Sequence, residues 1–377
     1  MPPPEPEASS PITTADVVFT EATPEQRILS WELNGASWAP PMTVRQYVGR
    51  ETALSETTLS ANGGTKYFIL HPKDDPSTIV SACEVTAKRA IVADASSGDA
   101  SSGSGTTREV AAYAIASVFT NPRFRERGMA GHMLRCVQDA VDATTECGAL
   151  YSDIGRVYYT RLGWKDFRSP QVLLALDDNL PAACPDGVAL LNAADVATLC
   201  DRDVEVVKGR FQRLAESGDG KTHVTFLPTP EQMAWHFTRD AYVCKTLLGR
   251  EVVHRGAKTE DGASWIYWDH DLRDKKLKVL RIVMREGGGP EKQREDVKRL
   301  LLAAVAEARE WALPKVLVWD PSREVAEIAT GIWKELGPQV QVIFEEREDG
   351  SIPSLRWKGG KGLEGVVWES NEYYAWC

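Results

Sequence analysis

Hydrophobic and polar positions in the first half of the chain switch repeatedly between strand-like and helix-like spacing. Some segments are short apolar or β-branched runs, while others repeat apolar residues at three- and four-residue steps. The pattern predicts strands over 16–20, 66–71, 78–92, 108–120, 149–154 and 171–176, and helices over 24–38, 43–59, 128–147 and 156–162. This mixture predicts an α/β (mixed α+β) domain over residues 16–180.

A similar order of elements returns after residues 176–187, a proline-containing segment with few periodic apolar positions, where we place a domain boundary. Beyond it the pattern predicts helices over 193–215 and 231–248 and strands over 265–269 and 276–284. A long helix with an apolar stripe from Val297 to Trp311 follows, and then a strand, a helix and a strand over 315–319, 323–336 and 340–345. We therefore expect a second α/β domain over residues 188–377 that repeats the order of elements seen over 108–176.

Two segments lack any such periodicity. Residues 1–15 are rich in Pro and Ser and are predicted to be disordered. Residues 94–107 read DASSGDASSGSGTT, a composition typical of a flexible loop between two strands.

Composition and charge narrow the class of protein. The 377 residues are 43% hydrophobic, and 44 basic against 54 acidic side chains leave a formal charge of −10. This charge argues against polyanionic partners such as nucleic acid or an anionic membrane surface. The seven cysteines are scattered without a CxxC pair, so neither a disulfide framework nor a metal site is predicted. With no long apolar run and an acidic, Pro-rich start, we expect a cytoplasmic protein.

The clearest chemical signal follows the strand that ends at Thr120. A helix is predicted to begin near Gly128, and the residues before it read Arg125-x-x-Gly128-x-Ala130. Free backbone N–H groups at a helix start bind phosphate, small residues let it approach, and Arg125 and Arg127 add positive charge. The segment is neither a P-loop nor a GxGxxG fingerprint.

The segment resembles motif A of the GCN5-related N-acetyltransferases (GNAT), whose pattern is Arg/Gln-x-x-Gly-x-Gly/Ala. Residues 158–164, YYTRLGW, are similar to motif B of the same superfamily, and the elements between the two motifs match. More diffuse features resemble the fungal lysine N6-acetyltransferases of lysine catabolism over nearly the whole chain from about residue 16. These features are Trp31, Trp38, residues 44–47, Cys83-Glu84, residues 150–155 and the C-terminal NEYYAWC.

The resemblance implies an N-terminal GNAT fold, with a mixed and mainly antiparallel sheet flanked by helices, and acetyl-CoA lying between the strands that end near Thr120 and Asp153. The residues implied in cofactor binding are Val118, Phe119, Thr120, Arg125, Glu126, Arg127, Gly128, Met129, Ala130 and Ser152. Ser152 and Gly155 depart from the Asn and Ala of many members. The second half lacks an equivalent of motif A, so it resembles a degenerate GNAT fold without a cofactor.

The implied reaction is direct transfer of the acetyl group to the side-chain amine of free L-lysine in a ternary complex. Tyr159 stands at the family's general-acid position, with Tyr158 as the alternative. The residues leave the base open: Glu84 and Glu109, on neighbouring strands, are candidates that also fit structural ion pairs, and a water chain is a third option. We predict Glu84.

Substrate binding is predicted for Glu109, Asp153, Glu372 and Tyr373, with the Trp-rich second half closing the amine pocket. The carboxylate of Cys377 is a further hypothesis. Two alternatives to lysine acetylation stay open, namely acetylation of an aminoglycoside or polyamine, and a non-catalytic CoA-binding regulator. The residues do not indicate the oligomeric state.

Overall fold

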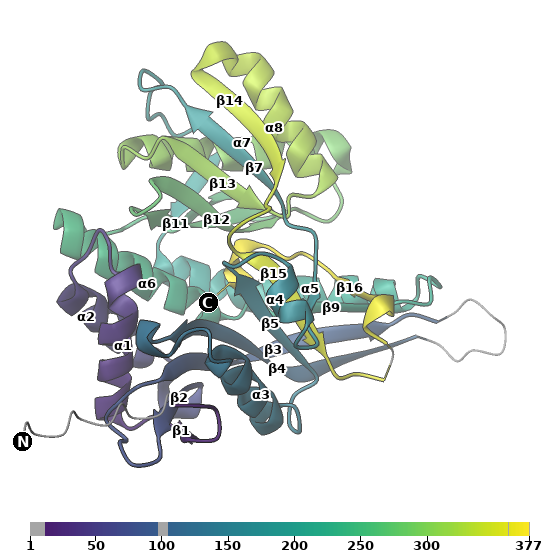
Figure 1. The fold of residues 1–377 in the computed structure, drawn as a ribbon. Coiled ribbons are helices and arrows are strands. Elements are labelled where there is room, and N and C mark those ends of the chain that lie inside the picture. Colours follow the sequence, from purple (N-terminus) through teal and green to yellow (C-terminus); the bar gives the residue numbers. More distant parts are fainter. Residues whose placement is uncertain (1–11, 97–104, 361, 377) are drawn as a thin grey trace, which may run out of the picture.

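Two mixed β-sheets, each accompanied by helices, lie one above the other in the computed structural model of the protein (Figure 1). The structure describes residues 12–96, 105–360 and 362–376. Most of the predicted disordered N-terminus, most of the predicted flexible loop and Cys377 lie outside the described residues. Residues 12–15 differ from the predicted disorder. The chain turns there, and the Asp16 carboxylate holds the turn by accepting hydrogen bonds from Thr13 N and Oγ1 (2.9 and 2.7 Å).

The first sheet has the strand order β1-β2-β3-β4-β5-β15-β6, with β9 paired to β3 and β16 paired to β9. All neighbours on the main path are antiparallel except β4 and β5, which are parallel. Its strands are β1 (Val17–Glu21), β2 (Thr65–Pro72), β3 (Ser81–Asp94), β4 (Thr106–Thr120), β5 (Cys147–Ser152), β6 (Lys165–Asp166), β9 (Thr222–Phe226), β15 (Ile352–Trp357) and β16 (Val366–Trp368).

The second sheet repeats this pattern, with the order β8-β10-β11-β12-β13-β7-β14 and one parallel pair, β12 with β13. Its strands are β7 (Pro170–Leu176), β8 (Val188–Leu191), β10 (Gly256–Thr259), β11 (Trp265–Asp271), β12 (Lys276–Val283), β13 (Lys315–Trp319) and β14 (Val340–Glu346). The helices of the chain are α1 (Pro24–Trp38), α2 (Val44–Ser55), α3 (Met129–Val141), α4 (Val157–Thr160), α5 (Ala193–Ala215), α6 (Pro230–Leu248), α7 (Gly289–Glu310) and α8 (Arg323–Leu336).

The two sheets exchange strands. β7 belongs by sequence to the first half, yet it pairs with β13 and β14 in the second sheet, and in Figure 1 it lies between them. β15 belongs to the second half and takes the corresponding place beside β5 in the first sheet. The strand predicted over 171–176 is therefore confirmed, but its expected place in the first sheet is wrong. The pattern of apolar residues in a strand indicates which of its faces is buried, but it does not indicate which sheet the strand joins.

Helices cover both faces of the first sheet. In β2, Tyr67 and Ile69 point to the cluster under α1 and α2, whereas Phe68 and Leu70 pack with α3. This alternation follows from the two-residue period of a strand, and cover on both faces explains why almost all of β2 is buried. The helix predicted to reach residue 147 ends at Val141, because Cys147 is already the first residue of β5, where it pairs with Ala112 of β4.

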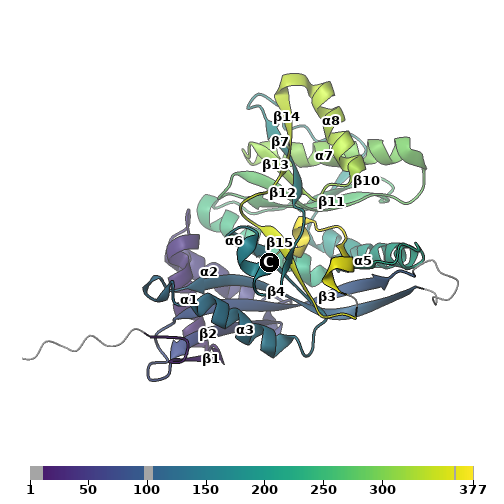
Figure 2. The same cartoon turned by 45° about the vertical axis from the view of Figure 1, so that its right-hand side comes forward.

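A shared hydrophobic core joins the two sheets. It combines Ala112 and Ala149 of the first sheet with Leu317 and Trp319 of the second, together with the C-terminal residues 373–375. Figure 2 shows the C-terminus between the two sheets. Within the described residues, no helix has both the length and the apolar character that crossing a membrane requires. The predicted mixed α/β fold class with helix-flanked sheets is confirmed.

Candidate active site

The parallel strands β4 and β5 separate at the centre of the first sheet. Their pairing runs only from Ala112 opposite Cys147 to Ile115 opposite Leu150, although β4 continues to Thr120. At the same point the register between β3 and β4 shifts, and Ser117 adopts a positive φ of 54°. This β-bulge turns β4 away from its partner and leaves one edge of its end without a neighbouring strand.

A cavity follows this free edge of β4 to the start of α3. Its lining includes eight of the ten residues predicted to bind the cofactor: Val118, Phe119, Thr120, Arg125, Glu126, Gly128, Met129 and Ala130. An extended edge of this kind can accept an extended ligand much as it would accept another strand. The cavity continues past Tyr158 and Tyr159.

The start of α3 is suited to hold a phosphate. Gly128 is the N-cap with φ 73°, its side-chain position meets no atom within 4 Å, and no side chain caps the helix. The first amides of α3 therefore stay available to an anion, and the helix dipole favours negative charge there. Arg125 stands beside them, with its guanidinium 5.4 Å from the Phe119 ring and its Nε donating to Thr120 O (3.2 Å). These features fit the pyrophosphate and pantetheine arm of acetyl-CoA.

The remaining two predicted cofactor residues do not line this cavity. Arg127 packs over Phe124, with 6.0 Å from its guanidinium to the ring centroid. Ser152 is buried, and its hydroxyl donates to Gly155 O (2.7 Å) and accepts from Ile154 N (3.2 Å). Its role in the structure is to hold the turn after β5, which its position in the sequence could not reveal.

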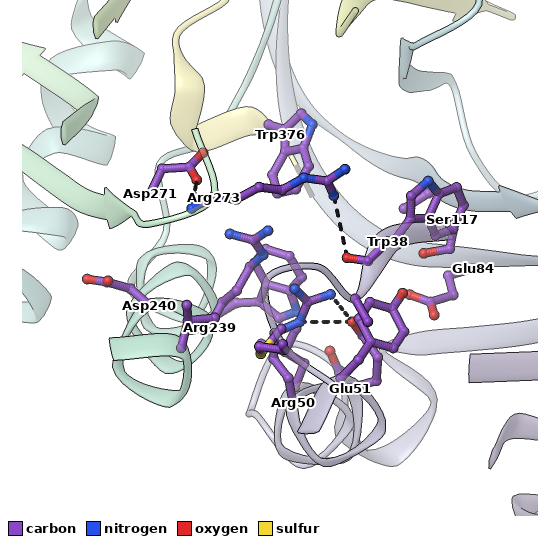
Figure 3. A pocket seen from close by; sticks show the side chains of 18 of the residues that line it. Trp38, Arg50, Glu51, Glu84, Ser117, Arg239, Asp240, Asp271, Arg273 and Trp376 are labelled. Atoms are coloured by element: carbon purple, nitrogen blue, oxygen red, sulfur yellow. Dashed lines mark hydrogen bonds and ion pairs between the residues drawn. The ribbon is translucent and has the colours of Figure 1, made fainter. Parts of the chain in front are cut away.

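A second cavity opens on the other side of the bulge (Figure 3). The two cavities share six lining residues, which are Trp38, Ile115, Ala116, Ser117, Tyr151 and Asp153. A thioester that reaches the bulge along the first cavity would therefore face a molecule bound in the second. We call the first the cofactor cavity and the second the acceptor cavity.

Glu84 is a carboxyl of the acceptor cavity that lies on β3 beside the bulge. It pairs in register with Ala116, and Figure 3 shows its side chain beside Ser117. The half-buried carboxyl accepts a hydrogen bond from Trp31 Nε1 (3.1 Å). Burial, reinforced by the charge of Glu51, raises the pKa of Glu84 to about 8. A carboxyl with a pKa in this range can exchange a proton near neutral pH.

The carboxylate of Glu51 forms an ion pair with the neighbouring Arg50. Arg50 donates to its carboxylate from Nε (3.0 Å) and from Nη2, and both side chains are buried on α2. Arg50 also lies 4.5 Å from the centroid of the Tyr47 ring. Glu51 therefore acts on Glu84 through its charge, while its own counter-ion is already in place.

The second half of the chain supplies the opposite wall. This wall consists of Trp235, Arg239, Asp240 and Val243 from α6, His270 to Arg273 at the end of β11, and Trp376. Buried polar contacts hold the C-terminal segment here: Lys88 Nζ donates to Ala375 O (3.2 Å) and His236 Nε2 lies 3.0 Å from Tyr374 O. Sequence reasoning expected the second half to close the pocket but did not identify Arg239.

The predicted substrate residues are spread over different sites. Asp153 lines both cavities, and its Oδ1 accepts from Ser351 N (2.8 Å). Glu109 lies on the surface in ion pairs with Arg89 (2.6 Å) and Lys208 (2.9 Å), and it lines neither cavity. Eight residues separate it from Ser117, about 27 Å along the strand. The expectation that Glu109 faces substrate is therefore wrong.

Glu372 and Tyr373 lie at the start of a short 3₁₀ helix, Tyr373–Ala375, that packs against the second sheet. Glu372 forms an ion pair with Arg281 and accepts a hydrogen bond from Ile282 N (3.1 Å) on β12. Tyr373 packs against Trp319 of β13 with 4.0 Å between ring centroids and the rings tilted by 35°. β12 and β13 pair over a short stretch, in which Leu277 to Val279 of β12 lie opposite Val316 to Val318 of β13. These two residues thus occupy the gap that corresponds to the cofactor cavity of the first sheet, and neither lines the acceptor cavity.

Tyr159 lies on the short helix α4 and lines the cofactor cavity. Its side chain is buried, packs against Tyr158 at right angles (5.2 Å between centroids), and burial raises its pKa above the usual value. The phenol therefore stays protonated at neutral pH. His132, on α3, lies 3.8 Å from Cys136 Sγ and lines neither cavity.

Comparison with known proteins places the chain in a family. The family model described as the LYC1 GNAT-like C-terminal domain matches residues 176–377. An uncharacterized protein of Saccharomyces cerevisiae, YGR111W, is 24% identical over 96% of this chain and 98% of its own length. A GCN5-related N-acetyltransferase from Kribbella flavida has a similar fold, with a TM-score of 0.50, 15% identity, and coverage of 91% of this chain and 72% of its own. The chain is therefore an acyltransferase of the GNAT superfamily and belongs to the family defined by the LYC1 GNAT-like C-terminal domain.

Proposed function

We propose that the protein transfers the acetyl group of acetyl-CoA to the side-chain amine of free L-lysine. The observation that carries this proposal is the meeting of the cofactor cavity and the acceptor cavity at the bulge of β4, beside a carboxyl whose pKa lies near neutrality. The choice of lysine rests on the resemblance of the sequence to the fungal lysine N6-acetyltransferases. The Glu84 carboxyl, which no cation pairs within 4 Å among the described residues, suits an acceptor with an ammonium group at this end of the cavity.

Acetyl-CoA, when bound, supplies an acetyl group activated as a thioester. The free edge of β4 would hold its pantetheine arm, and Arg125 with the amides at the start of α3 would hold its pyrophosphate. The two cavities would bring the amine and the thioester together without a covalent enzyme intermediate. Orientation of this kind supplies a large part of the rate enhancement in a two-substrate reaction.

Glu84 would act as the general base. Its ionised carboxylate takes a proton from the lysine ammonium, so that the neutral amine nitrogen can form the bond to the acetyl carbon. Tyr159 would act as the general acid and give its proton to the CoA sulfur when the carbon–sulfur bond breaks. When the tetrahedral adduct collapses, the nitrogen loses its second proton to solvent, and a proton from solvent replaces the one that Tyr159 gave to sulfur. The proton gained by Glu84 also passes to solvent, so each residue returns to its starting state and one proton is released overall.

Replacing Tyr159 by Phe is expected to lower kcat by about 10²-fold or more with little change in the KM for acetyl-CoA, because a proton donor is lost while the ring remains. Steady-state thiol-release assays across a pH series provide the measurement. The Tyr158→Phe variant is the matched control and should retain activity. Wild-type rates in Tyr159→Phe at every pH would show that Tyr159 serves packing alone.

The acceptor itself is tested by thiol release from acetyl-CoA in the presence of lysine, spermidine or kanamycin. We expect release with lysine, and NMR of the product should place the acetyl group on N6. Release with spermidine or kanamycin but not with lysine would redirect the proposal to another small amine. A protein that binds acetyl-CoA but acetylates none of the three would contradict the proposed function and favour a regulatory role.

A further inference from the structure

The charged groups of the acceptor cavity are separated between its two walls. Glu84 and the Arg50–Glu51 pair lie on the wall formed by β3 and α2, and Arg239 lies on α6 across the cavity (Figure 3). Because Arg50 and Glu51 are paired with each other, Glu84 is the carboxyl on the first wall that is left for a ligand. A ligand that spans the cavity would thus meet a carboxyl at one end and a guanidinium at the other.

The acidic side chains near Arg239 are engaged elsewhere. Asp240 forms an ion pair with Arg255 and a hydrogen bond with His270 Nδ1 (3.1 Å), and Figure 3 shows it pointing away from Arg239. Asp271 lies 3.6 Å from Lys278 Nζ and accepts from Arg273 N (3.1 Å). Their closest cationic contacts are therefore Arg255, His270 and Lys278, and not Arg239.

Arg239 is half-buried and forms no ion pair within 4 Å among the residues that the structure describes, although its charge lowers the pKa of Asp269 and Asp271 from farther away. Its guanidinium lies 5.4 Å from the centroid of the Trp376 ring, which restricts its orientation. A guanidinium that is partly removed from water without a directly bonded carboxylate is costly, and its planar fork matches a carboxylate. Arg273 also lines this wall, but it is exposed and donates to the Trp38 carbonyl (3.4 Å).

We infer that Arg239 binds a carboxylate of the acceptor, at the end of the cavity opposite to the reacting amine, and thereby selects amino acids over simple diamines. This inference rests on the proposed acetyltransferase function and adds the class of acceptor. The amine end points to Glu84 and the β4 bulge, whereas the carboxylate end is held by the second half of the chain. Arg239 is in this sense a specificity-determining residue.

Three acceptors with the same reactive end test this inference: L-lysine, 6-aminohexanoate, which keeps the carboxylate without the α-amine, and cadaverine, which lacks the carboxylate. In thiol-release assays we expect kcat/KM of the wild type for lysine and 6-aminohexanoate to exceed that for cadaverine by about 10- to 100-fold, the effect of a charge-assisted contact. The Arg239→Gln variant should lose this preference, because the KM for lysine and 6-aminohexanoate should rise much more than the KM for cadaverine. Arg239→Lys should restore part of it.

The matched control is Lys245→Gln, which removes an exposed cation from the same helix, where Lys245 pairs with Glu251 (2.7 Å). It should keep the wild-type preference. Equal rates of the wild type with lysine and cadaverine, or an equal loss for both acceptors in Arg239→Gln, would overturn the inference while leaving acetyl transfer itself intact.

Calorimetric titration of the CoA-loaded protein with 6-aminohexanoate gives a readout that does not depend on turnover. Binding about 10-fold or more weaker in Arg239→Gln than in the wild type supports the inference, and equal affinities overturn it. Failure of the wild type to acetylate any amine would instead overturn the proposed function. The two ideas can therefore fail separately.

Discussion

Replacing Glu84 by Gln is expected to lower kcat by about 10²- to 10⁴-fold, because the amide cannot accept the ammonium proton. The amide oxygen can still accept the hydrogen bond from Trp31, so the fold and acetyl-CoA binding should be preserved. The base works in its ionised form, which predominates above its pKa. Wild-type kcat/KM should therefore rise with pH up to about 8, and this limb should be absent from the residual activity of Glu84→Gln.

Two further variants separate this role from a general effect of charge. Glu51→Gln removes a charge that raises the pKa of Glu84, so the acidic limb of the wild-type profile should move to lower pH. Glu109→Gln changes an exposed glutamate on the neighbouring strand and should leave the pH profile unchanged. A Glu84→Gln enzyme with a normal rate and pH profile would leave water or another group as the base.

Dividing the chain after residue 180 is expected to leave both fragments unable to fold on their own. The N-terminal fragment would keep β7 without its partners β13 and β14, and its first sheet would lose β15, β9 and β16. It would thus expose unpaired strand edges and the core shared with the second sheet. Circular dichroism and size-exclusion chromatography should show aggregation or loss of the cooperative thermal transition found in the intact chain.

Co-expression provides the control for this division. Fragments 1–180 and 181–377 produced together should associate, because every exchanged strand then finds its place, and the complex should bind acetyl-CoA. A soluble 1–180 fragment that unfolds cooperatively and binds acetyl-CoA alone would contradict the expectation. The chain division at 180–188 proposed from the sequence would then describe independent folding units, rather than two sheets that complete one another.

Local sequence predicted most elements of the fold because their signals are local. The capping box of Thr23 with Gln26, and Pro24 at the first helical position, start α1 where the sequence indicated. Motif A was recognisable for the same reason, since a strand end, a glycine with positive φ and a helix start lie within a few residues. These interactions form between close neighbours in the chain and need no knowledge of the tertiary fold.

The acceptor cavity was only partly predictable. Glu84 and Glu109 look alike in the sequence, since each lies on a strand of the first sheet. The strand register and the bulge at Ser117 decide that Glu84 faces the cavity while Glu109 lies at the distant end of β4. The role of Ser152, the last residue of β5, is likewise decided by hydrogen bonds that a motif does not record.

Sequence alone determined the α/β class, the repeated order of elements and the phosphate-binding start of α3, because periodicity and turn chemistry act over a few residues. Tertiary structure decided which sheet receives β7 and β15, which glutamate meets the bulge, and that Arg239 and Trp376 face Glu84 across one cavity. The physical reason is that an apolar or charged pattern specifies which face of an element is buried or exposed. The partner that covers this face is chosen by packing between segments more than a hundred residues apart.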